Sequence, residues 1–215
     1  MEKYLNDTIL VTIDTKMVTI LKSGALKILQ LFYENKKSSL HFREIVRKTK
    51  LHEPSTASIL KLLHEESILK SQKVGNQKHY MLQLNTESFL WFEQFDYKRF
   101  QKLPSIRKNA YHYFMEALSE KPLIVLLFGS TARGTSSQQS DIDLLLITNS
   151  KIDLKKAQEH VETLTGIQIN AIQMTLSSFQ KELKLKEEPV IQSALATGYP
   201  LFNHIYFYEV LFNES

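Results

Sequence analysis

The sequence predicts an α/β (α+β) protein, in which a mixed sheet with helices follows a smaller helical domain that carries a β-hairpin. Two continuous apolar runs, residues 123–128 and 142–147, are typical of buried strands. Apolar residues recur at helical spacing over residues 25–33 and 59–68. A Gly-Asn pair at residues 75–76 separates two extended runs, which indicates a hairpin.

The composition is that of a folded globular protein. Of the 215 residues, 43% are hydrophobic and 23% are charged, which excludes the disordered and fibrous classes. Cysteine is absent, so any metal must be bound by oxygen or histidine ligands. The sequence shows no signal peptide, and no apolar run has the roughly 18 residues of a membrane span. We therefore expect a cytoplasmic protein without membrane contact.

The basic excess lies in the first half of the chain. Residues 1–100 contain 16 Lys and Arg against 11 Asp and Glu, whereas residues 101–215 contain 11 against 12. A basic bias confined to one half favours a polyanionic partner for that half. Solvated surface charge is the alternative.

Five elements are expected in the smaller domain. Apolar spacing predicts a helix from residue 23 to 33, and residues 40–42 form a short extended piece. A second, short helix follows over residues 42–50, and a third, which starts at a proline-containing turn, covers residues 52–68. Residues 68–84 complete the set as a hairpin.

This order of elements resembles the winged helix-turn-helix family over residues 23–85. The resemblance implies that the third helix enters the major groove of duplex DNA and that the hairpin contacts phosphates. The residues expected to face DNA are Ser55, Thr56, Ser58 and Lys61 on the helix, and Lys70, Lys73 and Lys78 on the hairpin. The helix differs from the recognition helices of strongly sequence-specific proteins because it has no arginine to form hydrogen bonds with guanine. A dimerisation or packing domain is the alternative interpretation.

Two further segments flank this domain. Residues 86–120 are expected to form a helical connector, which breaks at residues 103–105 and whose aromatic side chains pack between two domains. Base stacking is a less common use of aromatic residues at helical spacing. Residues 1–22 form an amino-terminal arm, either a strand or a dimer-forming segment, to which the sequence assigns no role.

The apolar run at residues 123–128 ends in a segment suited to phosphate. Gly129 lets the backbone approach an anion closely, and Ser130 adds a hydroxyl group. Residues 131–133 can begin a short helix whose free N–H groups face the same anion. The sequence therefore predicts a phosphate-binding site where this strand ends.

Two carboxylates open the second apolar run. Asp141 and Asp143 are two residues apart, so on a strand they point to the same face. Carboxylates this close repel each other, and a hard cation such as Mg²⁺ relieves the repulsion. A Mg²⁺ site that also contacts a triphosphate is expected here, where two ions about 3.5 to 4 Å apart can stabilise the attacking and leaving oxygens.

The string Phe128-Gly129-Ser130, followed after ten residues by Asp141-Ile142-Asp143-Leu144, resembles the signature of the polymerase-β-like nucleotidyltransferase superfamily, especially its small prokaryotic members. Arg133-Gly134 and Ser140 also match the usual form, and the domain is expected over residues 121–215. The resemblance implies a nucleotidyltransferase fold in which Gly129 and Ser130 hold the β- and γ-phosphates. It further implies that Asp141 and Asp143 bind Mg²⁺ and that Arg133 braces the phosphates.

The resemblance also implies a third acid on a later strand, and this chain lacks it. No Asp or Glu occurs between Glu162 and Glu182, and Asn170 is the residue expected nearest to the missing acid, with Gln168 on the same face. An amide can bind Mg²⁺, but it does not usefully accept a proton. Asn170 therefore raises the hypothesis of slow catalysis.

Two functions from different classes follow. The first is a Mg²⁺-dependent nucleotidyltransferase that moves a nucleoside monophosphate from NTP to a hydroxyl acceptor on protein, nucleic acid or a small molecule, with a DNA-binding winged helix. The second is a weak or inactive member of the fold that serves as a DNA-binding regulator or an antitoxin-like protein with a toxin partner. The sequence leaves the preferred NTP and the oligomeric state open, with a homodimer among the alternatives.

Overall fold

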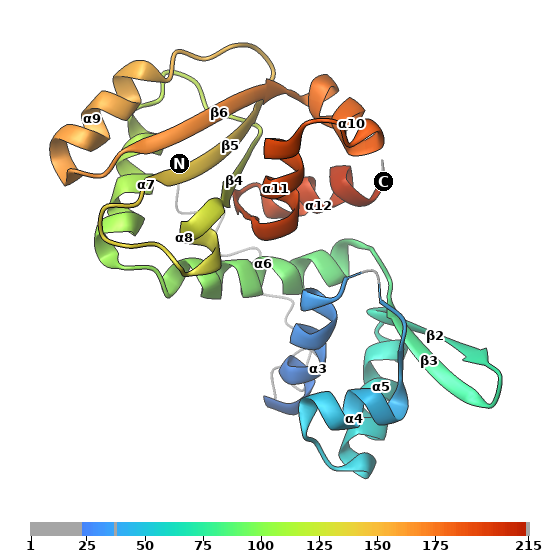
Figure 1. The fold of residues 1–215 in the computed structure, drawn as a ribbon. Coiled ribbons are helices and arrows are strands. Elements are labelled where there is room, and N and C mark those ends of the chain that lie inside the picture. Colours follow the sequence, from blue (N-terminus) through green and yellow to red (C-terminus); the bar gives the residue numbers. More distant parts are fainter. Residues whose placement is uncertain (1–22, 37, 214–215) are drawn as a thin grey trace, which may run out of the picture. The chain divides into compact units, whose positions relative to one another are not determined.

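The computed structural model describes residues 23–36 and 38–213, so the expected arm at residues 1–22 lies outside the described part of the chain. The chain divides into two compact units (Figure 1). The amino-terminal unit comprises Met1–Ser88 and the carboxy-terminal unit comprises Phe89–Ser215. Within the described residues, no helix is both long and apolar enough to cross a membrane.

The described part of the amino-terminal unit combines three helices with a small antiparallel sheet. Its elements are α3 (Ser23–Glu34), β1 (Leu40–His41), α4 (Phe42–Thr49), α5 (Glu53–Glu65), β2 (Leu69–Val74) and β3 (Gln77–Leu82). The strand order is β1-β3-β2, and Gly75 takes a φ of 59° in the turn between β2 and β3. Fully buried side chains from three helices, Ile28, Phe32, Ile45, Leu60 and Leu63, fill its core.

The carboxy-terminal unit is built on a mixed four-stranded sheet. Its elements are α6 (Thr86–Gln101, which begins just before the unit boundary), α7 (Ser105–Ala117), β4 (Ile124–Phe128), α8 (Gly129–Arg133), β5 (Ile142–Thr148), α9 (Lys155–Thr165), β6 (Ile169–Thr175), α10 (Leu176–Leu185), α11 (Pro189–Thr197), β7 (Tyr199–Phe202) and α12 (His204–Asn213). The strand order is β6-β5-β4-β7. Strands β5 and β6 are parallel, whereas β4 is antiparallel to both β5 and β7. The expected mixed sheet with helices is therefore confirmed.

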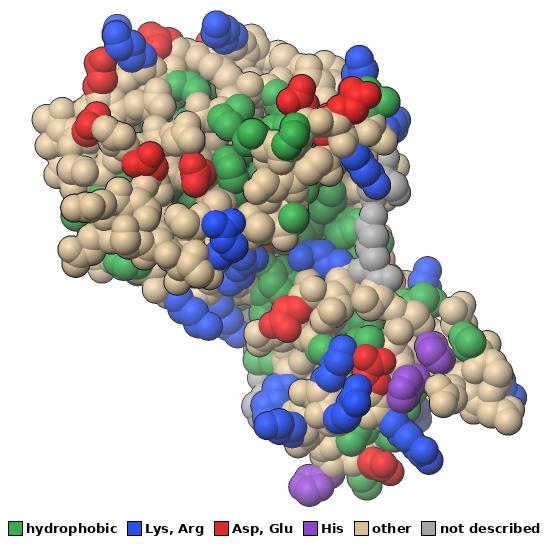
Figure 2. Space-filling view, in the orientation of Figure 1, with side chains coloured by type: hydrophobic (Ala, Val, Ile, Leu, Met, Phe, Trp, Pro, Cys, Tyr) green, Lys and Arg blue, Asp and Glu red, His purple; other side chains and the backbone are tan. Residues whose placement is uncertain are grey.

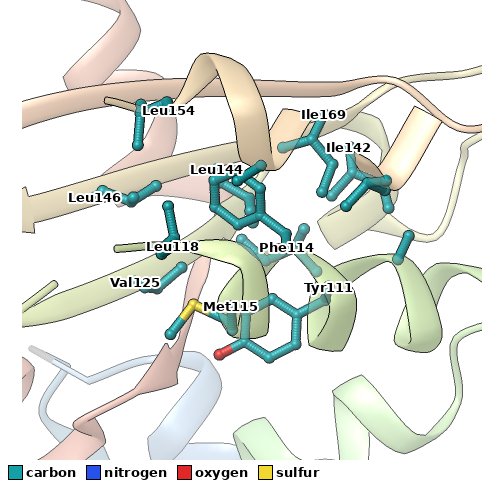
Figure 3. Packing of buried hydrophobic residues seen from close by; sticks show 14 of the residues in the cluster. Tyr111, Phe114, Met115, Leu118, Val125, Ile142, Leu144, Leu146, Leu154 and Ile169 are labelled. Carbon is teal, nitrogen blue, oxygen red and sulfur yellow. The ribbon is translucent and has the colours of Figure 1, made fainter. Parts of the chain in front are cut away.

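Strand β5 is buried on both faces, as its continuous apolar sequence predicts. Leu144 and Leu146 point to one face and Leu145 and Ile147 to the other, and all four are fully buried. Figure 3 shows the first face, where Leu144 and Leu146 meet Phe114 of α7. This packing holds the ends of β4 and β5 in fixed positions.

The helices expected to connect two domains contribute to the carboxy-terminal unit itself. Phe114 of α7 lies in the core of the sheet, and its side chain is fully buried. Phe89 and Phe92 of α6 pack on Tyr208 of α12, with ring centroids 5.7 and 5.0 Å away. Tyr208 also donates a 2.7 Å hydrogen bond to Asp96, which gives the buried hydroxyl an acceptor. Phe89, Phe92 and Phe114 are therefore core residues of this unit, whereas Tyr97 and Tyr113 are exposed.

Candidate functional site

The site is organised around Gly129, where β4 passes directly into α8. Gly129 has a φ of 69°, which is unfavourable for residues with a side chain. A Cβ at this position would overlap Oδ2 of Asp143 and lie 3.0 Å from its Cγ. Only glycine therefore allows the Asp143 carboxylate to lie directly over the start of α8.

Strand register brings Asn170 to the same carboxylate. Asp143 on β5 is paired with Phe128 on β4 and with Asn170 on β6. The Nδ2 atom of Asn170 donates a 3.1 Å hydrogen bond to Oδ1 of Asp143. Because an ionised carboxylate can only accept, the orientation of the amide is chemically fixed. Asn170 thus contributes a donor where a carboxylate would bring a second negative charge.

An open cleft of about 550 Å³ lies over these residues. Its polar side is formed by Gly129, Ser130, Arg133, Asp143 and Asn170. The remaining lining residues are Phe128, Ile172, Pro189, Val190 and Ser193. The structure therefore brings together five residues that the sequence motif predicted, and it adds an aliphatic wall from β6 and α11.

Residues 109–203 match the family model described as "Polymerase beta, Nucleotidyltransferase". The matched segment contains every residue that lines the cleft. This match supports the assignment of this part of the chain to the polymerase-β nucleotidyltransferase superfamily. No curated protein and no solved structure matches the sequence.

Asp141 lies differently from Asp143. Strand β5 begins at Ile142, so Asp141 precedes it, is exposed, and does not line the cleft. Its backbone oxygen accepts a 3.3 Å hydrogen bond from Thr131, which anchors this residue by its main chain. Of the two expected carboxylates, Asp143 lines the cleft, and Asp141 is not among the lining residues.

The donor set of the cleft suits a cation only when phosphate completes it. Within residues 23–36 and 38–213, no group of three or more His, Cys, Asp or Glu could hold a metal ion. Asp143 offers a carboxylate, and Asn170 offers an amide oxygen. A second carboxylate, that of Asp141, lies two residues before Asp143 in the sequence. Mg²⁺ is commonly bound by one or two carboxylates together with substrate phosphates. These residues fit that mode of binding.

Arg107 ties the helix α8 to the loop before β5. Its side chain is buried, and Nη1 donates a 2.8 Å hydrogen bond to Oγ1 of Thr131. Its Nη2 donates to the backbone oxygens of Ser137 and Ser140, at 2.7 and 2.8 Å. Burial lowers the pKa of Arg107, and the charge of Asp141 acts in the opposite direction.

The sequence did carry a signal for Arg107. The residue lies three, four and seven positions before Ala110, Tyr111 and Phe114, so it falls on the apolar face of α7. A charged residue on such a face needs buried partners. Which partners it meets depends on contacts with residues 24 to 33 positions further along the chain.

Helix α11, the apolar wall of the cleft, is fixed at both ends. At its start, a carboxylate oxygen of Glu182 accepts hydrogen bonds from the backbone N–H of Glu188 at 3.0 Å and from Gln192 at 2.5 Å. Burial raises the pKa of Glu182, but these hydrogen bonds outweigh burial and the pKa lies below its usual value. At its end, a Cβ on Gly198 would lie 2.7 Å from the backbone oxygen of Leu127, so α11 closes directly against β4.

A second arginine joins α11 to α8. The Nη2 atom of Arg99 lies 3.3 Å from the backbone oxygens of Ala132 and Thr197, to which it donates. Its guanidinium group stacks 3.9 Å above the ring of Tyr199. Arg99 and Arg107 therefore both bind α8 by hydrogen bonds, and neither was identified from the sequence motif.

The residues expected to face DNA fall into three structural situations. Thr56 is fully buried and donates to His52, so it belongs to the core and not to an exposed helix face. Ser55 and Ser58 are exposed, although Ser58 donates to the backbone of its own helix. Lys61 is exposed and forms a 3.8 Å ion pair with Glu65.

The three lysines of the hairpin are exposed, and two of them share one face. Lys73 on β2 is paired directly with Lys78 on β3, so both side chains project from the same face of the hairpin. Lys70 pairs with Met81 on the opposite face. Like charges directly across a strand pair are destabilising. This repulsion would be relieved by an anion bound between them.

Proposed function

We propose that the nucleotidyltransferase domain transfers a nucleoside monophosphate from NTP to a hydroxyl group with the help of Mg²⁺. The observation that carries this proposal is the placement of Asp143 directly over Gly129, inside a cleft that also contains Arg133. A triphosphate at this place meets backbone N–H groups, a hydroxyl group and a cationic side chain on one side. A carboxylate lies on the other side to hold the metal.

In the proposed reaction, an acceptor oxygen attacks the α-phosphorus of the NTP. A new bond forms between this oxygen and phosphorus, the bond from the α-phosphorus to the bridging oxygen breaks, and pyrophosphate leaves. The acceptor proton passes to solvent. When bound, Mg²⁺ neutralises phosphate charge. Ser130 and Arg133 would orient the phosphates, and Asp143 and Asp141 would hold the metal.

Asn170 limits the rate in this proposal because it offers no proton acceptor. Its amide donates to Asp143, so it orients the carboxylate while leaving the acceptor hydroxyl without a nearby base. We expect Asn170→Asp to lower the Tm without metal, because two carboxylates then face each other. We expect Mg²⁺ to reverse this loss and the transfer rate to rise by about a hundredfold. A brisk wild-type rate that Asn170→Asp does not increase would contradict this role.

The proposal is tested by thermal unfolding of the full chain with Mg²⁺ and each NTP. A ligand that binds only the folded state at a hundredfold excess over its Kd stabilises it by about 2.7 kcal/mol, which raises the Tm. Asp143→Asn should abolish the increase. Glu159→Gln is the matched control because Glu159 is an exposed carboxylate of the same domain outside the cleft. Wild-type protein that no NTP stabilises would exclude the proposed substrate class.

A second proposal is that the amino-terminal unit is a winged helix module that binds duplex DNA, which would make the protein a DNA-bound enzyme or regulator. The paired Lys73 and Lys78 favour it, because phosphate would relieve their repulsion. Binding should weaken steeply with salt, and replacing Lys70, Lys73 and Lys78 with alanine should reduce that dependence. Failure of the full chain to bind duplex DNA at low salt would leave packing or dimerisation as the role of this unit.

A further inference from the structure

Helix α4 of the amino-terminal unit carries its charges on two distinct flanks. Glu44 and Lys48 share one flank, where a 3.0 Å ion pair joins them. A hydrogen bond from Lys48 lowers the pKa of Glu44, with smaller electrostatic contributions from His41 and Arg47. Arg43 and Arg47 are four residues apart on the other flank, and both are exposed. Among the described residues, neither arginine forms an ion pair.

The arginine flank does not serve the stability of the helix. Like charges four residues apart on a helix repel each other. Arg43 also lies in the first turn of α4, where the helix dipole disfavours a cation. Arg47 lies in the last turn, where the dipole favours it, and Glu44 three residues earlier attracts it, so the repulsion is partly offset. An anion that binds to this flank would relieve the remaining repulsion.

Helix α5 offers much less to an anion. Its exposed charged residues, Glu53, Lys61 and Glu65, include two acids, and Lys61 is already paired with one of them. Thr56 is buried. The positive charge of the helical part of this unit therefore lies mainly on α4. Figure 2 shows Lys and Arg side chains over the visible surface of the amino-terminal unit, with few acidic side chains between them.

We infer that the Arg43–Arg47 flank of α4 is a contact surface for the phosphate backbone of duplex DNA. This inference rests on the proposed DNA binding of the amino-terminal unit, and it assigns the main helical contact to α4 in place of α5. Arginine can bind phosphate through two parallel hydrogen bonds, which suits both exposed guanidinium groups. Phosphate contacts carry no base information, so this surface binds DNA of any sequence.

The test measures binding of the full chain to a short DNA duplex of mixed sequence at several salt concentrations. Each lost phosphate contact reduces the slope of log K against log salt by about 0.9, so the double variant Arg43→Gln, Arg47→Gln should lose about two units of slope. The matched control is Lys27→Gln, Lys61→Gln. It removes the same charge from exposed positions on α3 and α5 of the same unit and leaves α4 unchanged, including the ion pair between Glu44 and Lys48.

The outcomes separate the inference from the DNA-binding proposal beneath it. Wild-type protein that does not bind DNA at low salt would overturn both. Wild-type binding that the arginine variant retains, or that the control weakens equally, would overturn only the inference. Thermal unfolding provides the check on folding, since removing the repulsion should leave the Tm of the arginine variant at or above the wild-type value. A slope reduced only in the arginine variant supports α4 as the contact surface.

Discussion

Arginine is used in opposite ways by the two units. In the carboxy-terminal unit, Arg107 is buried and donates three hydrogen bonds of 2.7 to 2.8 Å. In the amino-terminal unit, Arg43 and Arg47 are exposed and form no ion pair with any described residue. The buried arginine fixes the geometry of a site, whereas the two exposed arginines repel each other across one turn of helix. The same residue type therefore serves as a scaffold in one unit and, in our proposal, as a binding surface in the other.

The largest effect is expected from removing the buried guanidinium group. Arg107→Ala leaves Thr131 and two backbone oxygens without their donor, and it should lower the free energy of unfolding by about 3 kcal/mol or more. Arg107→Lys keeps a charge but lacks the planar fork, so an intermediate loss is expected. Urea unfolding measures both changes. If the Arg107→Ala variant were as stable as the wild type, the position of α8 would not depend on this residue.

A second effect separates backbone strain from crowding at the site. Gly129 and Gly134 both have positive φ, but nothing lies within 4 Å of a Cβ at Gly134. Gly134→Ala should therefore cost only about 1 kcal/mol, the penalty of the left-handed conformation. Gly129→Ala should cost more and abolish stabilisation by Mg²⁺ and NTP, because it displaces Asp143. Equal losses in the two variants would mean that Asp143 does not need the space over Gly129.

The third prediction concerns pH in the carboxy-terminal unit. Burial lowers the pKa of His204 to about 4 from an ordinary value of 6.5. Its Nδ1 atom lies 3.9 Å from Oε1 of Glu93. As the pH falls, His204 is protonated in the unfolded chain near pH 6.5 but in the folded chain only near pH 4. The contribution of neutral His204 to the free energy of unfolding is therefore fully present above pH 6.5 and is lost as the pH is lowered toward 4. The expected loss is about 1 to 2 kcal/mol by pH 5. His204→Gln should remove this part of the pH dependence in urea unfolding; an unchanged profile would contradict the assignment.

The smallest effect has the opposite sign. Arg43→Gln removes a repulsion and an unfavourable dipole interaction, so it should raise the free energy of unfolding by about 0.3 kcal/mol. Differential scanning calorimetry in low salt measures it best, because added salt screens the repulsion. A destabilised Arg43→Gln variant would show that this side chain contributes to packing, and the contrast between the two kinds of arginine would then weaken.

Local patterns predicted the centre of the site, because its parts are close in sequence. An apolar strand, a glycine at its end and carboxylates at the start of the next strand placed Gly129 and Asp143 in one cleft. Asp141 does not line the cleft, and strand β5 begins one residue after it. Pro189 and Val190 were missed because they reach the cleft from a helix about sixty residues further along, and only tertiary packing brings them there.

The amino-terminal unit shows how a helix face can be misjudged. Thr56 was placed on an exposed face by its position in the predicted third helix. Yet it lies four residues before Leu60 and seven before Leu63, which are both fully buried. This spacing puts Thr56 on the apolar stripe of α5, and its hydroxyl group is satisfied by the helix backbone. The periodicity of the sequence alone was sufficient to place this residue in the core.

The two fixed ends of α11 have a consequence for the kinetics of ligand binding. Glu182 holds its first turn, and Gly198 packs its last turn against β4 without room for a side chain. The cleft wall therefore cannot swing outward without breaking one of these attachments. A nucleotide enters a cleft whose width is already set, so association should follow a single exponential phase whose rate rises linearly with nucleotide concentration.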